Sequence, residues 1–244
     1  MTRTLFDSHA TTPFAISRSG LELFANCPRC FYFDKRLGHS RPPSLPFTLN
    51  NAVDTLLKRD FDDCRRRREP HPLMAEAGID AVPFDHPNLD QWRDVRRGIR
   101  FSHKPSGLDV YGAVDDVWKH SRGELIIVDY KATAKAAEVT ELNEAWHIAF
   151  KRQIEIYQWL FRQNDFMVSP TAYWVYANGD VSAEQFDQTL RFRMTVIPYT
   201  GSDDWVEPHI MAAKACLMNN SPPPPTDDCK YCRFADSRST YTSQ

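Results

Sequence analysis

The chain has 244 residues, and its 30 Lys and Arg against 32 Asp and Glu give a formal net charge of -2. At roughly 150 residues per domain, this length fits one large domain with a buried core and excludes a peptide-sized scaffold. The hydrophobic content of 42% is ordinary for a soluble globular protein. The charge balance gives no global attraction to nucleic acid, so an anionic partner would have to meet a local patch.

Membrane insertion and secretion are also disfavoured by the sequence. No apolar run approaches the ~18 residues of a membrane span, and the densest one covers only residues 125–128. The N-terminal segment lacks the continuous apolar stretch of a secretory signal. We therefore expect a cytoplasmic protein without membrane contact.

Hydrophobic periodicity predicts alternating helices and strands, and hence an α/β fold. In chain order we expect a helix over 17–37 kinked at Pro28, a helix over 53–68, an irregular connection over 69–87, a short polar helix over 88–98, a β-hairpin of strands 108–118 and 124–131, a long helix over 143–164, strands over 171–177 and 190–197, and a helix over 203–217. Four prolines at 222–225 then indicate a stiff polyproline II spacer.

The predicted hairpin carries the residues of greatest chemical interest. Asp129 and Lys131 lie two positions apart on one strand, so their side chains share a face, and Asp115 on the partner strand can reach the same space. Two carboxylates that converge there suit Mg²⁺ or Mn²⁺. A lysine beside them can stabilise the charge that grows on a phosphate oxygen. This combination indicates phosphodiester hydrolysis.

Gln153 and Tyr157 follow on the long predicted helix. Their i,i+4 spacing places them on one face, where both could bind a nucleic-acid backbone or the catalytic groups. Taken singly, each of these motifs is more often ordinary surface or core edge. Their order along the chain distinguishes them: a CP-containing helix, a G-x-x-D strand, a strand ending in D-x-K, a Q-x-x-x-Y helix and a C-terminal CxxC.

In this order of motifs the sequence resembles the RecB-family branch of the PD-(D/E)XK nuclease superfamily, particularly its CRISPR-associated and helicase-partner members. The resemblance implies a restriction-endonuclease-like mixed β-sheet flanked by helices. It also implies that Asp115 and Asp129 bind the divalent metal, that Lys131 is catalytic, and that Gln153 and Tyr157 form the extra motif of the branch.

Two further metal ligands follow from the same resemblance. The family has an additional ligand, usually His, on an N-terminal helix, and Asp54 stands at the corresponding position here. The backbone carbonyl of Tyr130 is a further candidate ligand. Asp116 neighbours Asp115 but belongs to the opposite face of the strand, and the motif favours Asp115.

Four of the six cysteines form two CxxC pairs near the ends of the chain: Cys27, Cys30, Cys229 and Cys232. Such pairs suit a tetrahedral Zn²⁺ site or a [4Fe-4S] cluster. The family members hold an iron–sulfur cluster with one N-terminal Cys and a C-terminal C-x2-C-x5-C, but Arg238 occupies the last position here. Both metals therefore remain open. We expect a structural clamp that joins the N- and C-terminal segments.

The segment 91–104 combines cations with aromatic rings, as a groove for single-stranded nucleic acid requires. A solvated helix face explains the same pattern equally well. The candidate contacts with nucleic acid are Arg93, Arg96, Arg97, Arg100 and Lys104.

We expect residues 1–244 to form a single nuclease domain, with an N-terminal helical part at about 17–100, a catalytic core at about 107–200, and a C-terminal helix with the cysteine clamp at about 202–234. The preferred function is a metal-dependent nuclease, an exonuclease that acts on single strands or DNA ends. One alternative is a catalytically weak or inactive DNA-binding subunit of a helicase, defence or CRISPR adaptation complex. Another is a zinc-clamped α/β domain of unrelated function.

Overall fold

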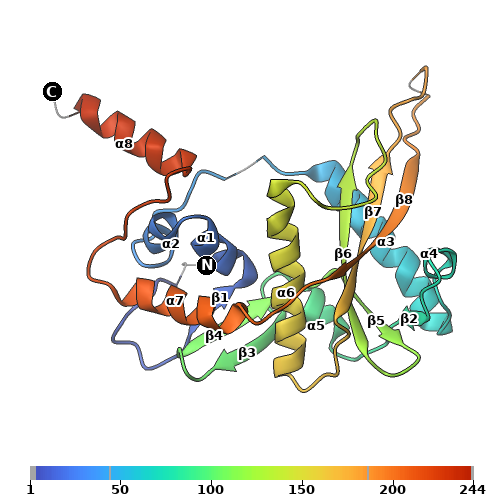
Figure 1. Ribbon diagram of the computed structural model, residues 1–244, viewed down its shortest axis with the longest axis horizontal. Coiled ribbons are helices and arrows are strands. Elements are labelled where there is room, and N and C mark those ends of the chain that lie inside the picture. Colours follow the sequence, from blue (N-terminus) through green and yellow to red (C-terminus); the bar gives the residue numbers. More distant parts are fainter. Residues whose placement is uncertain (1–3, 44, 186, 243–244) are drawn as a thin grey trace. The chain divides into compact units, whose positions relative to one another are not determined.

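The computed structural model describes residues 4–43, 45–185 and 187–242, which form two compact units. The first unit contains the described residues up to 45, together with 100–111 and 204–242. The second contains the described residues of 46–99 and 112–203. Figure 1 shows the elements of both.

Three helices and a three-stranded sheet form most of the first unit. The sheet has the order β1-β4-β3, in which β1 (Phe14–Ser17) runs parallel to β4 (Leu108–Gly112), with β3 (Ile99–His103) on the other side of β4. Helices α1 (Arg18–Asn26), α2 (Pro28–Lys35) and α7 (Val206–Met218) pack against one another, and α8 (Lys230–Thr242) follows near the C-terminus.

The predicted kink at Pro28 is a complete break between α1 and α2. Cys27 ends α1 with an extended backbone and also caps α2, where its Sγ accepts a hydrogen bond from the Cys30 backbone N–H at 3.5 Å. Proline at the first position of α2 needs no N–H donor there, so the break costs no helical hydrogen bond. The turn places Cys27 and Cys30 on one buried surface.

A five-stranded mixed sheet is the centre of the second unit. Its order is β2-β5-β6-β7-β8, antiparallel except for the parallel pair β6–β7. The strands are β2 (Ala81–Pro83), β5 (Asp116–His120), β6 (Leu125–Thr133), β7 (Thr171–Gly179) and β8 (Phe192–Thr200). This architecture confirms the predicted α/β fold with a mixed sheet flanked by helices.

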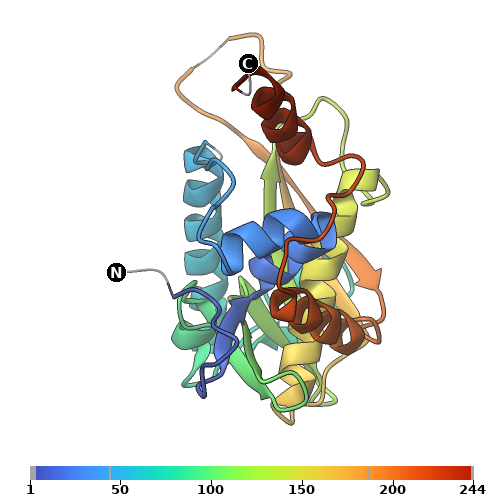
Figure 2. The same ribbon diagram turned by 90° about the vertical axis from the view of Figure 1, so that its left-hand side faces the viewer.

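Helices cover both faces of this sheet. Figures 1 and 2 show α3 (Thr48–Arg67) on one face and α6 (Ile148–Gln163) on the other. Short helices α4 (Pro72–Glu76) and α5 (Leu89–Arg93) lie in the connections, and a 3-10 turn, η1 (Ala145–His147), precedes α6. Phe61 of α3 stacks on Trp118 of β5, with ring centroids 5.5 Å apart, so aromatic packing fixes α3 on the sheet.

Three sequence predictions are wrong in detail. Residues 108–118 form two strands in different sheets, β4 and β5, so the predicted hairpin consists only of β5 and β6. The connection 69–87 contains α4 and β2. The polar helix expected over 88–98 is only α5.

The break between β4 and β5 follows from a close approach of two backbones. Gly98 has a positive φ of 59°, and a Cβ atom there would collide with the Gly112 carbonyl. Only glycine tolerates both conditions. The chain leaves the first sheet after Gly112 and enters the second at Asp116, so Asp115 lies in the connection between them.

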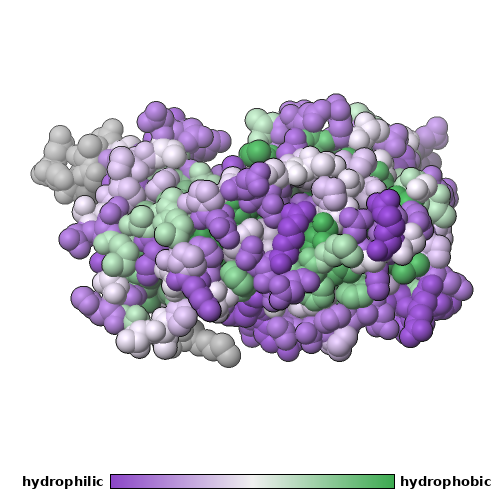
Figure 3. All heavy atoms as spheres, turned by 60° about the horizontal axis from the view of Figure 1, so that its bottom comes forward, coloured by the Kyte–Doolittle hydropathy of each residue, from purple (hydrophilic) through white to green (hydrophobic). Residues whose placement is uncertain are grey.

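Figure 3 shows hydrophilic residues over much of one face of the molecule, with smaller hydrophobic areas between them. Among the described residues, the helices are too short or too polar to cross a membrane.

Candidate active site and cysteine cluster

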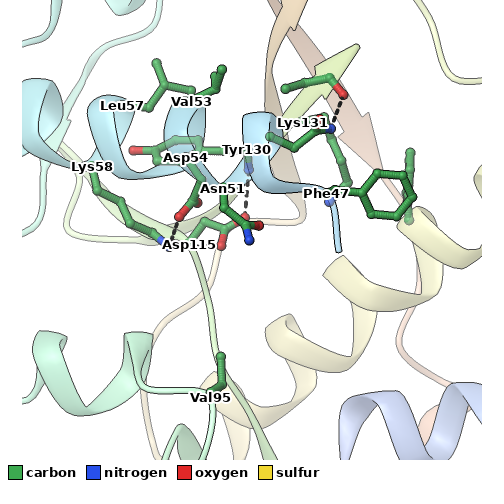
Figure 4. A pocket seen from close by; sticks show the side chains of 13 residues that line it. Phe47, Asn51, Val53, Asp54, Leu57, Lys58, Val95, Asp115, Tyr130 and Lys131 are labelled. Carbon is green, nitrogen blue, oxygen red and sulfur yellow. Dashed lines mark hydrogen bonds and ion pairs between the residues drawn. The ribbon is translucent and has the colours of Figure 1, made fainter. Parts of the chain in front are cut away.

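A cavity of about 480 Å³ in the second unit contains several of the predicted site residues. Asp54 and Lys58 from α3, Asp115 from the segment before β5, and Lys131 from β6 all line it, as Figure 4 shows. Asp54 and Lys131 are 77 positions apart in the sequence, and the structure brings their side chains to the same cavity. Phe150 of α6 also lines the cavity.

Asp129 precedes Tyr130 and Lys131, which line this cavity, and is itself completely buried. It forms an ion pair with Lys131, which also lies over the ring of Phe150 at 4.6 Å. Burial raises the pKa of Asp129 to about 7; Lys131 opposes this shift, whereas the nearby carboxylate of Asp115 adds to it. A carboxylate in such surroundings gains strongly from a cation, which is the electrostatic condition for a metal ligand.

Gln153 reaches the same carboxylate from α6 and is bonded in turn to Tyr157. The Gln153 Nε2 donates to Asp129 Oδ1 at 2.8 Å and to the Tyr157 hydroxyl at 3.3 Å. The i,i+4 spacing in the sequence therefore corresponds to hydrogen bonds that run from Tyr157 through Gln153 to Asp129. These hydrogen bonds fix the orientation of the Asp129 carboxylate.

Asp115 is held by its own set of donors. The Tyr130 backbone N–H donates to Asp115 Oδ2 at 2.9 Å, and Lys58 Nζ lies 3.4 Å from Asp115 Oδ1. Lys58 also lies 2.9 Å from Asp54 Oδ2, which links the two carboxylates. The sequence analysis did not identify Lys58, although its i,i+4 spacing from Asp54 was the available signal.

Asp116 has a different environment from its neighbour, in agreement with the opposite strand face. It is completely buried and pairs with the guanidinium groups of Arg65 and Arg93. The Tyr130 hydroxyl donates to its Oδ2 at 2.8 Å. Since Tyr130 separates Asp129 from Lys131 in sequence, this buried network anchors the strand that carries both.

The predicted nucleic-acid residues do not form one group. The side chain of Arg93 is only 11% exposed and pairs with Asp62 and Asp116 inside the fold, so it is removed from the predicted binding surface. Arg100 pairs with Asp109 in the first unit. Arg97 is 60% exposed and pairs with Asp94. Arg96 and Lys104 are exposed.

The four cysteines of the CxxC pairs lie together in the first unit, buried around one point. The Sγ separations are 3.8 Å for Cys27–Cys232, 3.6 Å for Cys30–Cys229 and 3.5 Å for Cys30–Cys232. Four thiolates at about 2.3 Å from one ion are about 3.8 Å apart in a tetrahedron. The four sulfur atoms therefore fit a metal site.

The surroundings act differently on the thiols of the cluster: burial raises the pKa of Cys30 and Cys232, whereas the pKa of Cys27 is lowered. Burial raises the pKa of Cys27, but hydrogen bonds to the backbone of Cys30 and Thr226 outweigh burial and lower the pKa to about 6. Arg41 Nη2 lies 3.5 Å from Cys229 Sγ, and its guanidinium stacks over the ring of Tyr231 at 4.6 Å. This positive charge offsets part of the negative charge that four thiolates bring to one ion.

Together, the mixed sheet and the Asp-x-Lys strand beside a second aspartate define the class of protein. The chain matches the model of the PD-(D/E)XK nuclease superfamily over residues 15–237, and it belongs to this superfamily. No curated protein matches it. Among solved structures, a chain titled "Crystal structure of SSO0001" is similar at 16% sequence identity, covering 94% of this chain and 87% of that chain with a TM-score of 0.41.

Proposed function

We propose that the protein is a divalent-metal-dependent DNA nuclease of the RecB-family branch, which hydrolyses phosphodiester bonds on single strands or DNA ends as an exonuclease. Membership of the superfamily supports the reaction class. The observation that carries the proposal is a cavity lined by Asp115 and Lys131, together with the buried carboxylate of Asp129, which pairs with Lys131 and accepts a hydrogen bond from Gln153.

The carboxylates of Asp115 and Asp129, the backbone carbonyl of Tyr130 and the carboxylate of Asp54 offer only hard oxygen ligands, which suit Mg²⁺ or Mn²⁺. Such an ion supplies Lewis-acid charge and activates water for attack on phosphorus. Lys131 stabilises the charge on the scissile phosphate. Gln153 and Tyr157 orient Asp129 and, through it, the reacting groups.

The proposal extends to the parts of the chain outside the cavity. Residues 1–244 act as one nuclease domain, in which the first unit carries the cysteine clamp and the second carries the chemistry. In this proposal the exposed Arg96 and Arg97 of the second unit contact phosphates of DNA, and so do the exposed Lys104 and the half-buried Arg100 of the first unit. The domain works in the cytoplasm, where the six cysteines stay reduced, and a helicase or a CRISPR or defence protein supplies unwound strands.

The cysteine site holds one Zn²⁺ ion in this proposal. Three of the sulfur separations, at 3.5–3.8 Å, match a tetrahedron around a single ion, and all four sulfur atoms lie within 4.8 Å of one another, which supports this assignment. A [4Fe-4S] cluster binds each thiolate to a different iron, which requires the sulfur atoms to lie farther apart. The zinc holds the two ends of the chain together and takes no part in hydrolysis.

A second candidate function is a nuclease-like DNA-binding subunit with weak or no activity. The observation that favours it is Asp54, which stands where the family has His and is engaged by Lys58. Purified protein should be incubated with end-labelled single-stranded and duplex DNA and with RNA, in Mg²⁺, Mn²⁺ or EDTA. Metal-dependent DNA cleavage that Asp129→Asn abolishes supports the nuclease. DNA binding without cleavage under any divalent metal supports the binding subunit.

A further inference from the structure

Lys58 lies inside the candidate active site. It belongs to α3, one turn after Asp54, and its side chain is 23% exposed. Its ammonium is 2.9 Å from Asp54 Oδ2 and 3.4 Å from Asp115 Oδ1. Figure 4 shows the side chain reaching from the helix towards both carboxylates. The two carboxylates come from different elements, so Lys58 joins α3 to the segment before β5.

This position has a consequence for cation binding. Asp115 Oδ1 is engaged by Lys58 and its Oδ2 by the Tyr130 N–H. An ion bridging Asp54 and Asp115 would have to occupy the space of the ammonium. Asp129 pairs with a different cation, the ammonium of Lys131. A second cation is therefore disfavoured next to Asp54, where the Lys58 ammonium already lies.

The formal charges of the cavity lead to the same result. Asp54 and Asp115 in the cavity and the buried Asp129 beside Lys131 carry three negative charges when ionised, and Lys58 and Lys131 carry two positive charges. One divalent ion and one bound phosphodiester bring the sum to zero. A second divalent ion would leave an uncompensated double positive charge in a partly buried site, which is unfavourable.

We propose that Lys58 is a built-in counter-cation that takes the place of the second divalent ion of two-metal sites. This inference rests on the proposed metal site at Asp115 and Asp129. In the free enzyme the Lys58 ammonium pairs with Asp54 and Asp115 and so keeps solvent cations away from both carboxylates. When substrate binds in the cavity that both lysines line, its ammonium adds to the positive charge that Lys131 offers the phosphate. It thus acts as a catalytic residue, and Asp54 serves to position it in place of acting as the additional metal ligand.

Binding of Mn²⁺, followed by electron paramagnetic resonance of the free ion, tests this directly. Lys58→Met removes a positive charge 3.4 Å from the carboxylate of the proposed ligand Asp115, so Mn²⁺ should bind at least about tenfold more tightly, while DNA cleavage at saturating Mn²⁺ should fall. Arg59→Met removes an exposed cation at the next position of α3 and should bind Mn²⁺ as the wild type does. Lys58→Arg keeps the charge and should also retain the wild-type affinity.

The outcomes separate this inference from the proposed function. Unchanged or weaker Mn²⁺ binding by Lys58→Met, together with weakened binding by Asp129→Asn, would overturn the role of Lys58 alone. Wild-type Mn²⁺ binding by Asp129→Asn would show that the proposed metal site is wrong, and the inference would fall with it. A loss of folding in Lys58→Met, visible by circular dichroism, leaves Lys58→Arg and Lys58→Gln to decide: the charge-keeping variant must bind Mn²⁺ less tightly than Lys58→Gln.

Discussion

The side-chain amide of Gln153 donates a hydrogen bond to Oδ1 of the buried Asp129 at 2.8 Å. This contact joins α6 to β6 at the point where the Asp-x-Lys pair lies. Because Asp129 is completely buried, neighbouring protein groups such as Gln153 and Lys131 determine how its carboxylate is turned. The orientation of a proposed metal ligand therefore depends on a residue that lies in a different element.

Gln153→Ala should weaken Mn²⁺ binding or DNA cleavage by about 10–100-fold, the usual cost of losing a partner of a metal ligand. The fold should survive, because one hydrogen bond contributes only about 1 kcal/mol. Mn²⁺ titration and cleavage rates check this prediction. Gln163→Ala, at the end of the same helix, is the matched control. Equal effects of the two substitutions would contradict a positioning role for Gln153.

Substitution of Arg93 should mainly lower the stability of the fold, whereas substitution of Arg97 should mainly lower the affinity for DNA. Arg93→Ala leaves Asp116 buried without one of its two guanidinium partners and should lower the free energy of unfolding by about 3 kcal/mol. Arg97→Ala removes an exposed cation and should change stability by no more than about 0.5 kcal/mol. Urea denaturation measures both.

Among folded variants, Arg97→Ala should lower the affinity for a single-stranded oligonucleotide more than Arg93→Ala does. Arg97→Ala should weaken binding severalfold and reduce its dependence on salt, as expected when a phosphate contact is lost. Lowered stability in Arg97→Ala with unchanged DNA affinity would argue against an exposed binding surface in this segment.

The residues that the sequence could predict are those with a local pattern. Asp129 and Lys131 share a strand face, and Gln153 and Tyr157 share a helix face. The structure joins Lys131 and Gln153 to the Asp129 carboxylate, and Tyr157 to Gln153. The pairing of the two CxxC motifs likewise follows from spacing and from the shared preference of thiolates for one metal. These relationships need only the period of a strand or helix, together with the chemistry of the ligands.

What the sequence could not predict depends on contacts between distant segments. The pairing of β1 with β4 joins residues more than ninety positions apart, and it divides a run of alternating residues that reads as one strand. Arg93 resembles its basic neighbours in sequence, yet Asp116 draws it into the interior. Lys58 acquires its significance only from the position of Asp115.

The cysteine cluster should contain one zinc ion per chain. Cys232→Ser should lose the metal and lower the melting temperature, because the ligands near the two ends of the chain would no longer be joined. Cys216→Ala, a buried thiol in the same unit but outside the cluster, should keep its metal. Elemental analysis and absorption spectra of anaerobically purified protein provide the measurement. Four irons per chain with visible absorption would contradict the zinc assignment.

The most direct test of the account is DNA cleavage by Lys131→Met. Wild-type protein with Mn²⁺ should degrade end-labelled DNA, and the variant should lose about 10²–10³-fold in rate while keeping its circular dichroism spectrum. Lys135→Met, which removes an exposed lysine four positions later, should cleave normally. Undiminished cleavage by a folded Lys131→Met would contradict the assignment of the active site.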